Sequence, residues 1–222
     1  YIKVCGIYTH LCCADTLLPE DVEFSENQID NFYYLIDKLK EWGVQIPKVH
    51  IQSSYGLLNY PQLVCDYVRV GIALYGVLSK PDENTRVKID LHPVLSLKAR
   101  VVLIRSVSKQ DTVSYGRRFQ AKRDSLIAIV SIGYGDGFPR HLSCEKGGVL
   151  IRGQYAPIVG RICMDQLAVD ITEIEDVSVG NVATLIGFDT MDIAAPNIAQ
   201  HFNSISNELL CRMGARLPII IK

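Results

Sequence analysis

The sequence predicts an α/β segment followed by a mostly antiparallel β-barrel or β-sandwich domain, with the boundary near residue 91. Two observations predict this. Before residue 91, short apolar runs alternate with a helical pattern, which is typical of βα units with a parallel sheet. After it, strand-like runs follow one another with Gly, Asp, Pro and Asn turns between them, which is typical of an antiparallel barrel or sandwich. We therefore expect two domains, residues 1–91 and 92–222.

The first domain contains one strong helix pattern. Ser25 and Gln28 form a capping box that predicts the start of the helix, and Gly43 predicts its end. Between them, apolar residues recur at spacings of three and four, at Ile29, Phe32, Tyr33, Ile36 and Leu39.

Short apolar runs flank this helix and predict strands over Ile2–Ile7, Val49–Ile51 and Val70–Tyr75. About three βα units fit in this part of the chain, too few to close an eight-unit barrel of roughly 250 residues. We expect the last βα units of a TIM-type (β/α)8 barrel, and expect the chain to be a fragment of a longer protein.

In the second domain, six runs predict strands: Val94–Ser106, Ser125–Ile132, Gly148–Ile151, Ala156–Val159, Leu167–Ile171 and Val182–Ile186. One helix is predicted near the end, over Ile193–Phe202, with Asp192 as its N-cap and Pro196 in its first turn.

Composition excludes several functional classes. The 222 residues are 48% hydrophobic, and 23 basic residues nearly balance 24 acidic ones. A nucleic-acid-binding protein should show a basic excess, and a membrane span needs about 18 consecutive apolar residues. Neither feature is present in this sequence. The N-terminus has the pattern of neither a signal peptide nor an initiator start.

The seven cysteines predict buried free thiols in a reducing cytosol. Their number is odd and no two form a C-x-x-C pair, whereas zinc sites need paired ligands at short spacings. His10, Cys12 and Cys13 form the one cluster that suggests a metal site, and that signal is weak, so we expect no metal.

Three polar segments are candidates for chemistry. Val113–Gly116 places a tyrosine beside a glycine, Ile132–Gly137 places three glycines around a tyrosine and an aspartate, and Val159–Gln166 places Arg and Asp in an apolar run. Each segment alone is more typical of a turn. The spacing of Gly135 and Gly137 is not that of a phosphate loop.

Taken in order with other segments, these motifs resemble the alanine racemase family, which is pyridoxal-phosphate dependent and combines a barrel with a β-domain. The resemblance covers essentially the whole chain. The other segments are Gly6–His10, His50–Ser54, Arg69–Gly76 and Arg216–Pro218. Residues 53–60 are similar to the membrane-linked serine/alanine racemases of vancomycin resistance, whose catalytic domain is cytosolic. The resemblance therefore implies a cytoplasmic catalytic domain and a possible N-terminal membrane domain.

The resemblance also implies which residues hold pyridoxal 5'-phosphate. Arg69 would lie against the pyridine nitrogen, to which a guanidinium cannot give a proton. His50 would orient Arg69, and His10 would lie against the cofactor ring. The phosphate would be bound by the Ser54 hydroxyl and by the backbone amides of Gly71 and Ile72.

Tyr115 matches the family's catalytic base for the L-amino acid. Its phenol needs activation, which Arg69 and His10 could supply by favouring phenolate. The second base is a Schiff-base lysine in an N-terminal motif that does not occur here, so no lysine of this chain is assigned that role. The arginine that assists the tyrosine also belongs to the absent part.

The resemblance implies a homodimer with the active site at the subunit interface. Tyr115, Cys163, Met164 and Asp165 would come from the second subunit, with the Met164 amide near the substrate carboxylate. Residues of the family's entry corridor correspond to Tyr134, Ile205, Arg140 and Arg161. Asp136 and Asp165 could equally be loop acceptors of backbone amides.

Asn207 bears on the substrate. Alanine racemases usually carry a tyrosine here, which contacts the cofactor phosphate and crowds the substrate side chain. Asparagine is smaller and offers both a donor and an acceptor. The resemblance therefore implies a racemase of L- and D-serine that also accepts alanine and supplies D-amino acid for peptidoglycan precursors.

Other interpretations remain open: a plain alanine racemase, a basic-amino-acid decarboxylase of the same fold, or a non-catalytic pyridoxal-phosphate-binding module. Arg69 counts against the decarboxylase, because those enzymes usually oppose the pyridine nitrogen with a carboxylate. The β-domain counts against the binding module.

Overall fold

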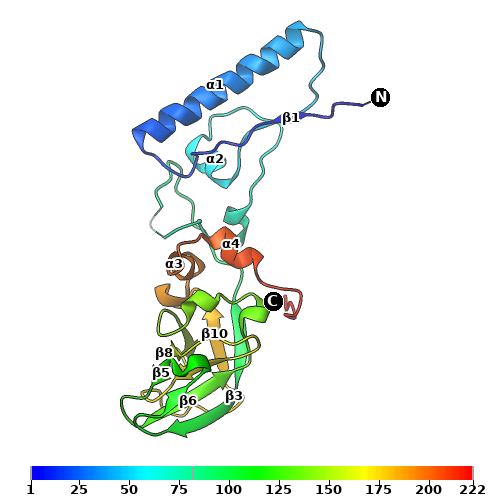
Figure 1. The fold of residues 1–222 in the computed structure, drawn as a ribbon. Helices are drawn as coiled ribbons and strands as arrows, with labels where there is room; N and C mark the ends of the chain where they lie inside the picture. The colour runs from blue at the N-terminus through cyan, green and yellow to red at the C-terminus, as the bar shows by residue number, and fades with distance from the viewer. Residues whose placement is uncertain (1, 82, 222) are drawn as a thin grey trace. The chain divides into compact units, whose positions relative to one another are not determined.

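The computed structural model describes residues 2–81 and 83–221 and divides the chain into two units (Figure 1). Unit 1 comprises Tyr1–Leu78 with Asp82–His92, and unit 2 comprises Ser79–Pro81 with Pro93–Lys222. In the part of the chain that is described, no helix combines the length and apolar character needed to cross a bilayer.

Unit 1 is built from short strands and one long helix. Its elements are β1 (Ile7–Tyr8), α1 (Pro19–Glu41), β2 (Val49–His50), α2 (Ser54–Asn59) and a 3-10 helix (Ile72–Tyr75). β1 and β2 pair in parallel, with Ile7 opposite Val49 and Tyr8 opposite His50. The predicted parallel pairing is therefore confirmed for these two strands.

The predicted start of the long helix is wrong. α1 begins at Pro19, six residues before Ser25, which is buried inside the helix. Proline suits a first turn because its missing N–H would have no helical partner there, and Glu20 and Asp21 favour the positive end of the helix dipole. The predicted end is confirmed, since Gly43 adopts the left-handed conformation (φ +80°) just past the helix.

Two predicted strands are also wrong. Of Ile2–Ile7, only Ile7 pairs with a neighbouring strand, so the rest has no ladder to join. Val70–Tyr75 forms a turn and the 3-10 helix because the N–H groups of Gly71 and Ala73 donate to the Ser54 hydroxyl. A side-chain acceptor thus replaces the backbone partner that a strand needs.

Unit 2 is a closed barrel of antiparallel strands in the order β10-β3-β6-β9-β8-β7. The predicted strands are confirmed, with shifted ends in four cases. Their bounds are β3 (Leu97–Val107), β6 (Ser125–Val130), β7 (Gly148–Ile151), β8 (Gln154–Val159), β9 (Leu167–Asp170) and β10 (Val182–Ile186). Apolar side chains fill the barrel, among them the buried Val101, Val130, Val149, Ile158 and Leu185.

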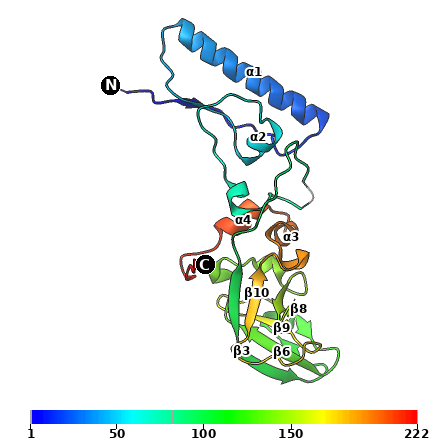
Figure 2. The same cartoon turned by 180° about the vertical axis from the view of Figure 1, so that it is seen from behind.

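Short elements complete unit 2. β4 (Thr112–Val113) and β5 (Phe119–Gln120) form a hairpin around a 3-10 turn, Tyr115–Arg117. Three further 3-10 helices span Tyr134–Asp136, Arg140–Leu142 and Met191–Ile193. The helices α3 (Ala195–Gln200) and α4 (Ser206–Cys211) lie at one end of the barrel, as both views show (Figures 1 and 2).

The predicted cap of the α3 helix is wrong. Ala194, not Asp192, is the N-cap, and Asp192 belongs to the preceding 3-10 helix. The Ala194 N–H donates to the Met191 carbonyl and closes that 3-10 helix, so Asp192 is not at the position that caps α3. Pro196 lies in the first turn as predicted.

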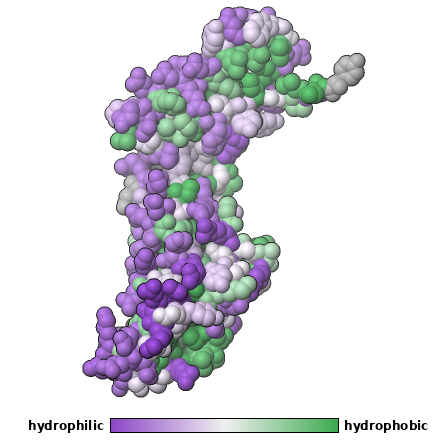
Figure 3. All heavy atoms as spheres, viewed as in Figure 1, coloured by the Kyte–Doolittle hydropathy of each residue, from purple (hydrophilic) through white to green (hydrophobic). Residues whose placement is uncertain are grey.

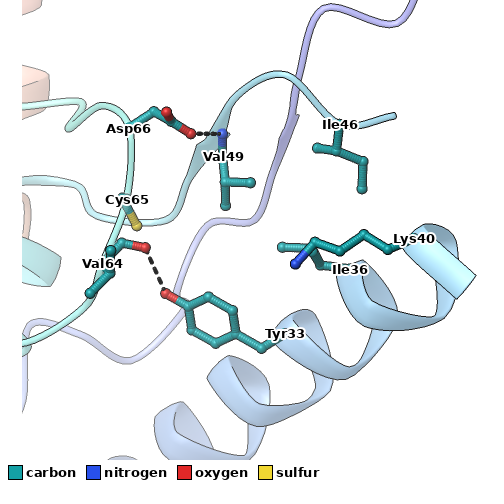
Figure 4. Close-up of a pocket in the computed structure, with 8 residues that line it drawn as sticks. All are labelled: Tyr33, Ile36, Lys40, Ile46, Val49, Val64, Cys65 and Asp66. Atoms are coloured by element: carbon teal, nitrogen blue, oxygen red, sulfur yellow. Dashed lines mark hydrogen bonds between the residues drawn. The ribbon is translucent and has the colours of Figure 1, made fainter. Parts of the chain in front are cut away.

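Hydrophobic side chains gather on the surface of unit 1 beside α1 (Figure 3). A pocket opens there between α1 and the chain that carries β2 (Figure 4). The Tyr33 hydroxyl donates to the Val64 carbonyl (3.1 Å), and the Asp66 carboxylate accepts the Val49 N–H (2.7 Å). These two hydrogen bonds connect α1 and β2 to residues 64–66.

We expect acid to weaken unit 1 through Asp66. The hydrogen bond from Val49 N–H, assisted by Lys48, holds the pKa of Asp66 below its usual value. A lowered folded-state pKa stabilises the fold above the unfolded value of about 4, and this stabilisation is lost as pH falls through the folded value. Urea unfolding followed across this range should show Asp66→Asn to be less stable at neutral pH and less sensitive to acid. Asp37→Asn, an exposed carboxylate on α1, is the control and should retain the parent's acid sensitivity.

Candidate active site

Arg69 is the centre of a hydrogen-bond cluster in unit 1. Its Nη1 lies 2.6 Å from Nδ1 of His50, and its Nη2 lies 3.2 Å from Nδ1 of His10. Nη2 also donates to the backbone carbonyls of Thr9 (2.8 Å) and Ile51 (3.0 Å). Because a guanidinium only donates, Nδ1 of His50 is the acceptor, which fixes the imidazole tautomer. Three of the predicted cofactor residues are therefore brought together.

Aromatic stacking also orients the arginine. Tyr8 stacks on His50 with ring centroids 5.1 Å apart, and Arg69 Cζ lies 5.1 Å from the Tyr8 ring centroid. The β1–β2 register places Tyr8 directly opposite His50. The guanidinium is thus held by its edge and by its face, which a more flexible lysine could not reproduce. Tyr8 was not predicted as a site residue.

Gly71, two residues after Arg69, is hydrogen-bonded to Ser54. Ser54 Oγ accepts the N–H groups of Gly71 (2.9 Å) and Ala73 (3.3 Å), so one hydroxyl and the backbone amides near Ile72 gather at the N-terminus of the 3-10 helix. A Cβ added at Gly71 would meet no atom within 4 Å, so the space beside this backbone is open. A hydroxyl and backbone amides beside open space fit a phosphate. Together with Arg69, the donor set suits an anionic, ring-nitrogen-containing cofactor.

In unit 2, Tyr115 lies in the turn between β4 and β5 with 70% of its surface exposed. The preceding Ser114 hydroxyl donates to the Arg161 carbonyl (2.7 Å) and accepts the Arg161 N–H (2.8 Å). Gly160 has φ +67°, and a side chain there would clash with Ser114. Hydrogen bonds therefore connect the predicted motifs 113–116 and 159–166, and they hold the backbone next to Tyr115 in place.

The third motif is joined to the same loop. The N–H groups of Tyr134 and Gly135 donate to the carbonyls of Cys163 (3.0 Å) and Met164 (2.9 Å). A side chain at Gly133 would overlap with the Cys163 carbonyl, so only glycine permits this approach. Cys163, Met164 and Tyr134 thus lie on one surface, and Met164 is half exposed.

Arg216 joins the two predicted aspartates. Its Nη2 is 2.5 Å from Asp165 Oδ1, and its Nε is 3.5 Å from Asp136 Oδ1. Asp136 is buried and its other oxygen accepts the Gly133 N–H (3.0 Å), which agrees with its interpretation as a loop acceptor. The hydrogen bond to Asp165 raises the pKa of Arg216. Arg216 was predicted only as part of a motif, and its role in positioning the 163–165 loop was not predicted.

Asn207 lies in the first turn of α4. Its Oδ1 accepts a hydrogen bond from the Ser79 hydroxyl (2.8 Å), and the neighbouring Ser206 N–H donates to the Ser79 carbonyl (2.8 Å). The side-chain amide is therefore held in place. Its Nδ2 group carries two N–H donors, for which no acceptor is found among the described residues.

The residues predicted for the corridor are dispersed within unit 2. Tyr134 and Arg140 line one surface hollow together with Pro139 and Arg212. Ile205 precedes α4, and Arg161 lies instead beside Gly116 in the Tyr115 turn. Within residues 2–81 and 83–221, no three His, Cys, Asp or Glu side chains lie close enough to hold a metal ion.

Comparison with known proteins identifies both halves of the chain. The family model described as "Alanine racemase, N-terminal domain" matches residues 1–79, and that described as "Alanine racemase, C-terminal domain" matches residues 94–221. An "Amino-acid racemase" of Enterococcus faecalis is 53% identical over 99% of the chain. A "Serine/alanine racemase" of Enterococcus gallinarum is 37% identical over 100% of it.

Solved structures share the architecture. Alanine racemase from Clostridium difficile 630 in complex with cycloserine superimposes with a TM-score of 0.87 at 35% identity, over 98% of this chain and 56% of that one. The predicted fold class, the end of a TIM-type barrel followed by a β-domain, is thereby confirmed. The chain spans 31% of the length of each of the two Enterococcus relatives.

Proposed function

The chain belongs to the alanine racemase family, and from this premise we propose that it contributes the cofactor-side and β-domain residues of a pyridoxal-phosphate-dependent racemase of serine and alanine. The observation that carries the proposal is the Arg69 cluster. The Arg69 guanidinium is permanently charged and is held by hydrogen bonds to His50, Thr9 and Ile51. Such a group suits a position beside the cofactor's ring nitrogen.

Pyridoxal phosphate, when bound, supplies an electron sink that makes the Cα proton of an amino acid acidic. Arg69 would donate a hydrogen bond to the ring nitrogen without transferring a proton, because a guanidinium stays protonated. His10 would lie against the ring. The Ser54 hydroxyl and the Ile72 amide would hold the phosphate, and the Gly71 N–H, which donates to Ser54 Oγ, would position that hydroxyl.

Tyr115 would carry the proton on the L-amino-acid side. The hydrogen bonds between Ser114 and Arg161 hold its backbone still, while the exposed ring leaves the hydroxyl accessible. The 163–165 loop, held by Arg216 and by the 133–135 turn, would present the Met164 amide to the substrate carboxylate. The second base of this two-base exchange is a lysine that we assign to no residue of this chain.

We further propose that the protein acts as a homodimer in which Tyr115 and the 163–165 loop serve the partner's cofactor. Light scattering combined with the absorption of the bound cofactor tests this arrangement. We expect a dimer with one cofactor per subunit, and a fully active monomer would contradict it.

The whole protein supplies the direct test of function. Incubated with pyridoxal phosphate and L-serine or L-alanine, it should form the D-enantiomer of each, measured by chiral chromatography. Turnover of alanine alone would instead identify a plain alanine racemase. Release of carbon dioxide from a basic amino acid would identify a decarboxylase, and cofactor binding without turnover would identify a binding module.

Serine preference is proposed on the basis of Asn207. The name of the Enterococcus gallinarum relative includes serine, and in this chain Ser79 holds the Asn207 amide so that its N–H donors remain for a ligand. A substrate hydroxyl that gains one hydrogen bond is stabilised by roughly 0.5–1.5 kcal/mol, or up to about tenfold in preference.

Asn207→Tyr should therefore lower the ratio of kcat/KM for serine to that for alanine by up to about tenfold, because it removes this partner and fills the space. Steady-state kinetics with both substrates measures the ratio. Asn31→Tyr, which changes an exposed asparagine on α1, is the matched control. An unchanged ratio in Asn207→Tyr would refute the specificity argument but leave the racemase proposal intact.

In the cell, we propose that such an enzyme supplies D-serine and D-alanine for peptidoglycan precursors, in the setting of vancomycin resistance, with the catalytic part in the cytoplasm. A membrane domain elsewhere in the whole protein is part of this proposal. Deleting the gene and measuring D-serine in the cell-wall precursors tests it, and an unchanged content would contradict it.

A further inference from the structure

Cys12 and Cys13 place two thiols side by side on the surface of unit 1. Their Sγ atoms are 3.4 Å apart, and neither residue is buried. Among the described residues, no other pair of cysteine sulfurs is in hydrogen-bond contact. The pair follows His10 after one intervening residue, Leu11, and the function proposed above does not use it.

The backbone that carries the pair is held in place. The Cys12 N–H donates to Gln28 Oε1 (3.3 Å). The Nε2 of the same Gln28 donates to the His10 carbonyl (2.9 Å) and to Thr9 Oγ1 (3.1 Å), so α1 holds the segment that precedes the pair. Because this segment is already ordered, a ligand that needs both sulfurs meets a smaller entropic cost.

Protonation distinguishes the pair from a reactive single cysteine. The hydrogen bond with the Cys12 sulfur, together with partial burial and the charge of Asp21, raises the pKa of the Cys13 thiol to about 11. A reagent that attacks through one thiolate should therefore react slowly with Cys13 at neutral pH. A divalent metal that needs three or four ligands finds no third one, since no group of three metal-binding side chains is present in residues 2–81 and 83–221.

We propose that Cys12 and Cys13 form a vicinal dithiol site that binds one thiophilic metalloid centre, of the trivalent arsenic class, through both sulfurs. Two As–S bonds form and the bonds from arsenic to oxygen break. The two thiol protons leave with that oxygen as water, and no oxidant or reductant is required. Forming the second bond is intramolecular, so the pair exceeds a single thiol in affinity by about 10²–10⁴-fold.

The test uses the whole reduced protein titrated with phenylarsine oxide in the presence of excess monothiol. Intact mass spectrometry should show one phenylarsenic adduct with the loss of one water, reversed by a dithiol and not by the monothiol. Cys12→Ser and Cys13→Ser should each lower the affinity by about 10²–10⁴-fold. Cys144→Ser, an exposed single thiol in unit 2, is the matched control and should bind like the parent.

Absence of the adduct from the parent, or an unchanged affinity in both single variants, would overturn the proposal. Urea unfolding of the variants shows whether they remain folded. If they do not, peptide mapping of the parent adduct decides, because the proposal requires the arsenic on the peptide that contains both Cys12 and Cys13. The site does not depend on racemase activity, so failure of one proposal leaves the other standing.

Discussion

Replacing Tyr115 by phenylalanine is expected to lower kcat for racemisation by about 10²–10⁴-fold, the usual contribution of a positioned general base. Cofactor binding should stay unchanged, because the ring still fills its volume and the Arg69 cluster belongs to other residues. The turn itself should also survive. It is held by Ser114 and Arg161 through hydrogen bonds that involve no tyrosine hydroxyl.

Deuterium exchange from solvent separates the two directions of the reaction. In D2O, Tyr115→Phe should stop exchange starting from the L-enantiomer, since that proton has lost its carrier. Tyr155→Phe is the matched control. It removes a hydroxyl from β8 in the same unit, where burial raises the pKa of the phenol and no catalytic role is proposed. Undiminished exchange from the L-enantiomer in Tyr115→Phe would remove Tyr115 from the role of base.

Replacing Arg69 by alanine is expected to have the second largest effect, a loss of cofactor affinity of about 10- to 150-fold. Hydrogen bonds that involve a charged group contribute about 1.5–3 kcal/mol each, and the variant lacks the one proposed to the ring nitrogen. It also leaves His50, Thr9 and Ile51 without their shared donor, so the cluster loses its order. Titrating the whole apo-protein with pyridoxal phosphate by absorbance measures the affinity.

Arg86→Ala is the control for this variant. Arg86 also belongs to unit 1, donates to a backbone carbonyl, that of Asn59 (3.0 Å), and stacks on an aromatic ring, that of Tyr60. Its removal should reduce stability but spare cofactor affinity. If the two variants lose equal affinity, the effect of Arg69 is general destabilisation and the proposed contact with the cofactor is wrong.

Local patterns were sufficient for the barrel of unit 2. Runs such as Gly148–Ile151 and Val182–Ile186 are rich in apolar and β-branched residues and end at turn residues, and the structure has strands with these same bounds. Gly43 likewise ended α1 as predicted, because the left-handed conformation past a helix favours glycine. These features depend only on residues that are close in sequence, so they can be predicted from the sequence.

The errors occurred where a distant partner decides the backbone. The capping-box pattern at Ser25 was overridden by Pro19 and by the burial of one face of α1 through Ile29, Phe32 and Ile36. Val70–Tyr75 has the composition of a strand, yet the Ser54 hydroxyl captures two of its N–H groups. No local periodicity contains that information.

The sequence by itself determined the family resemblance, the fold class and the identity of the polar residues, because each depends on residue types and their order along the chain. Only the tertiary structure decided which of them meet. It placed His10 and His50 on the two nitrogens of one guanidinium, Asp136 and Asp165 on Arg216, and Asn207 on Ser79. Hydrogen bonds depend on distance and direction between atoms, and these atoms become neighbours only after segments up to 128 residues apart have packed.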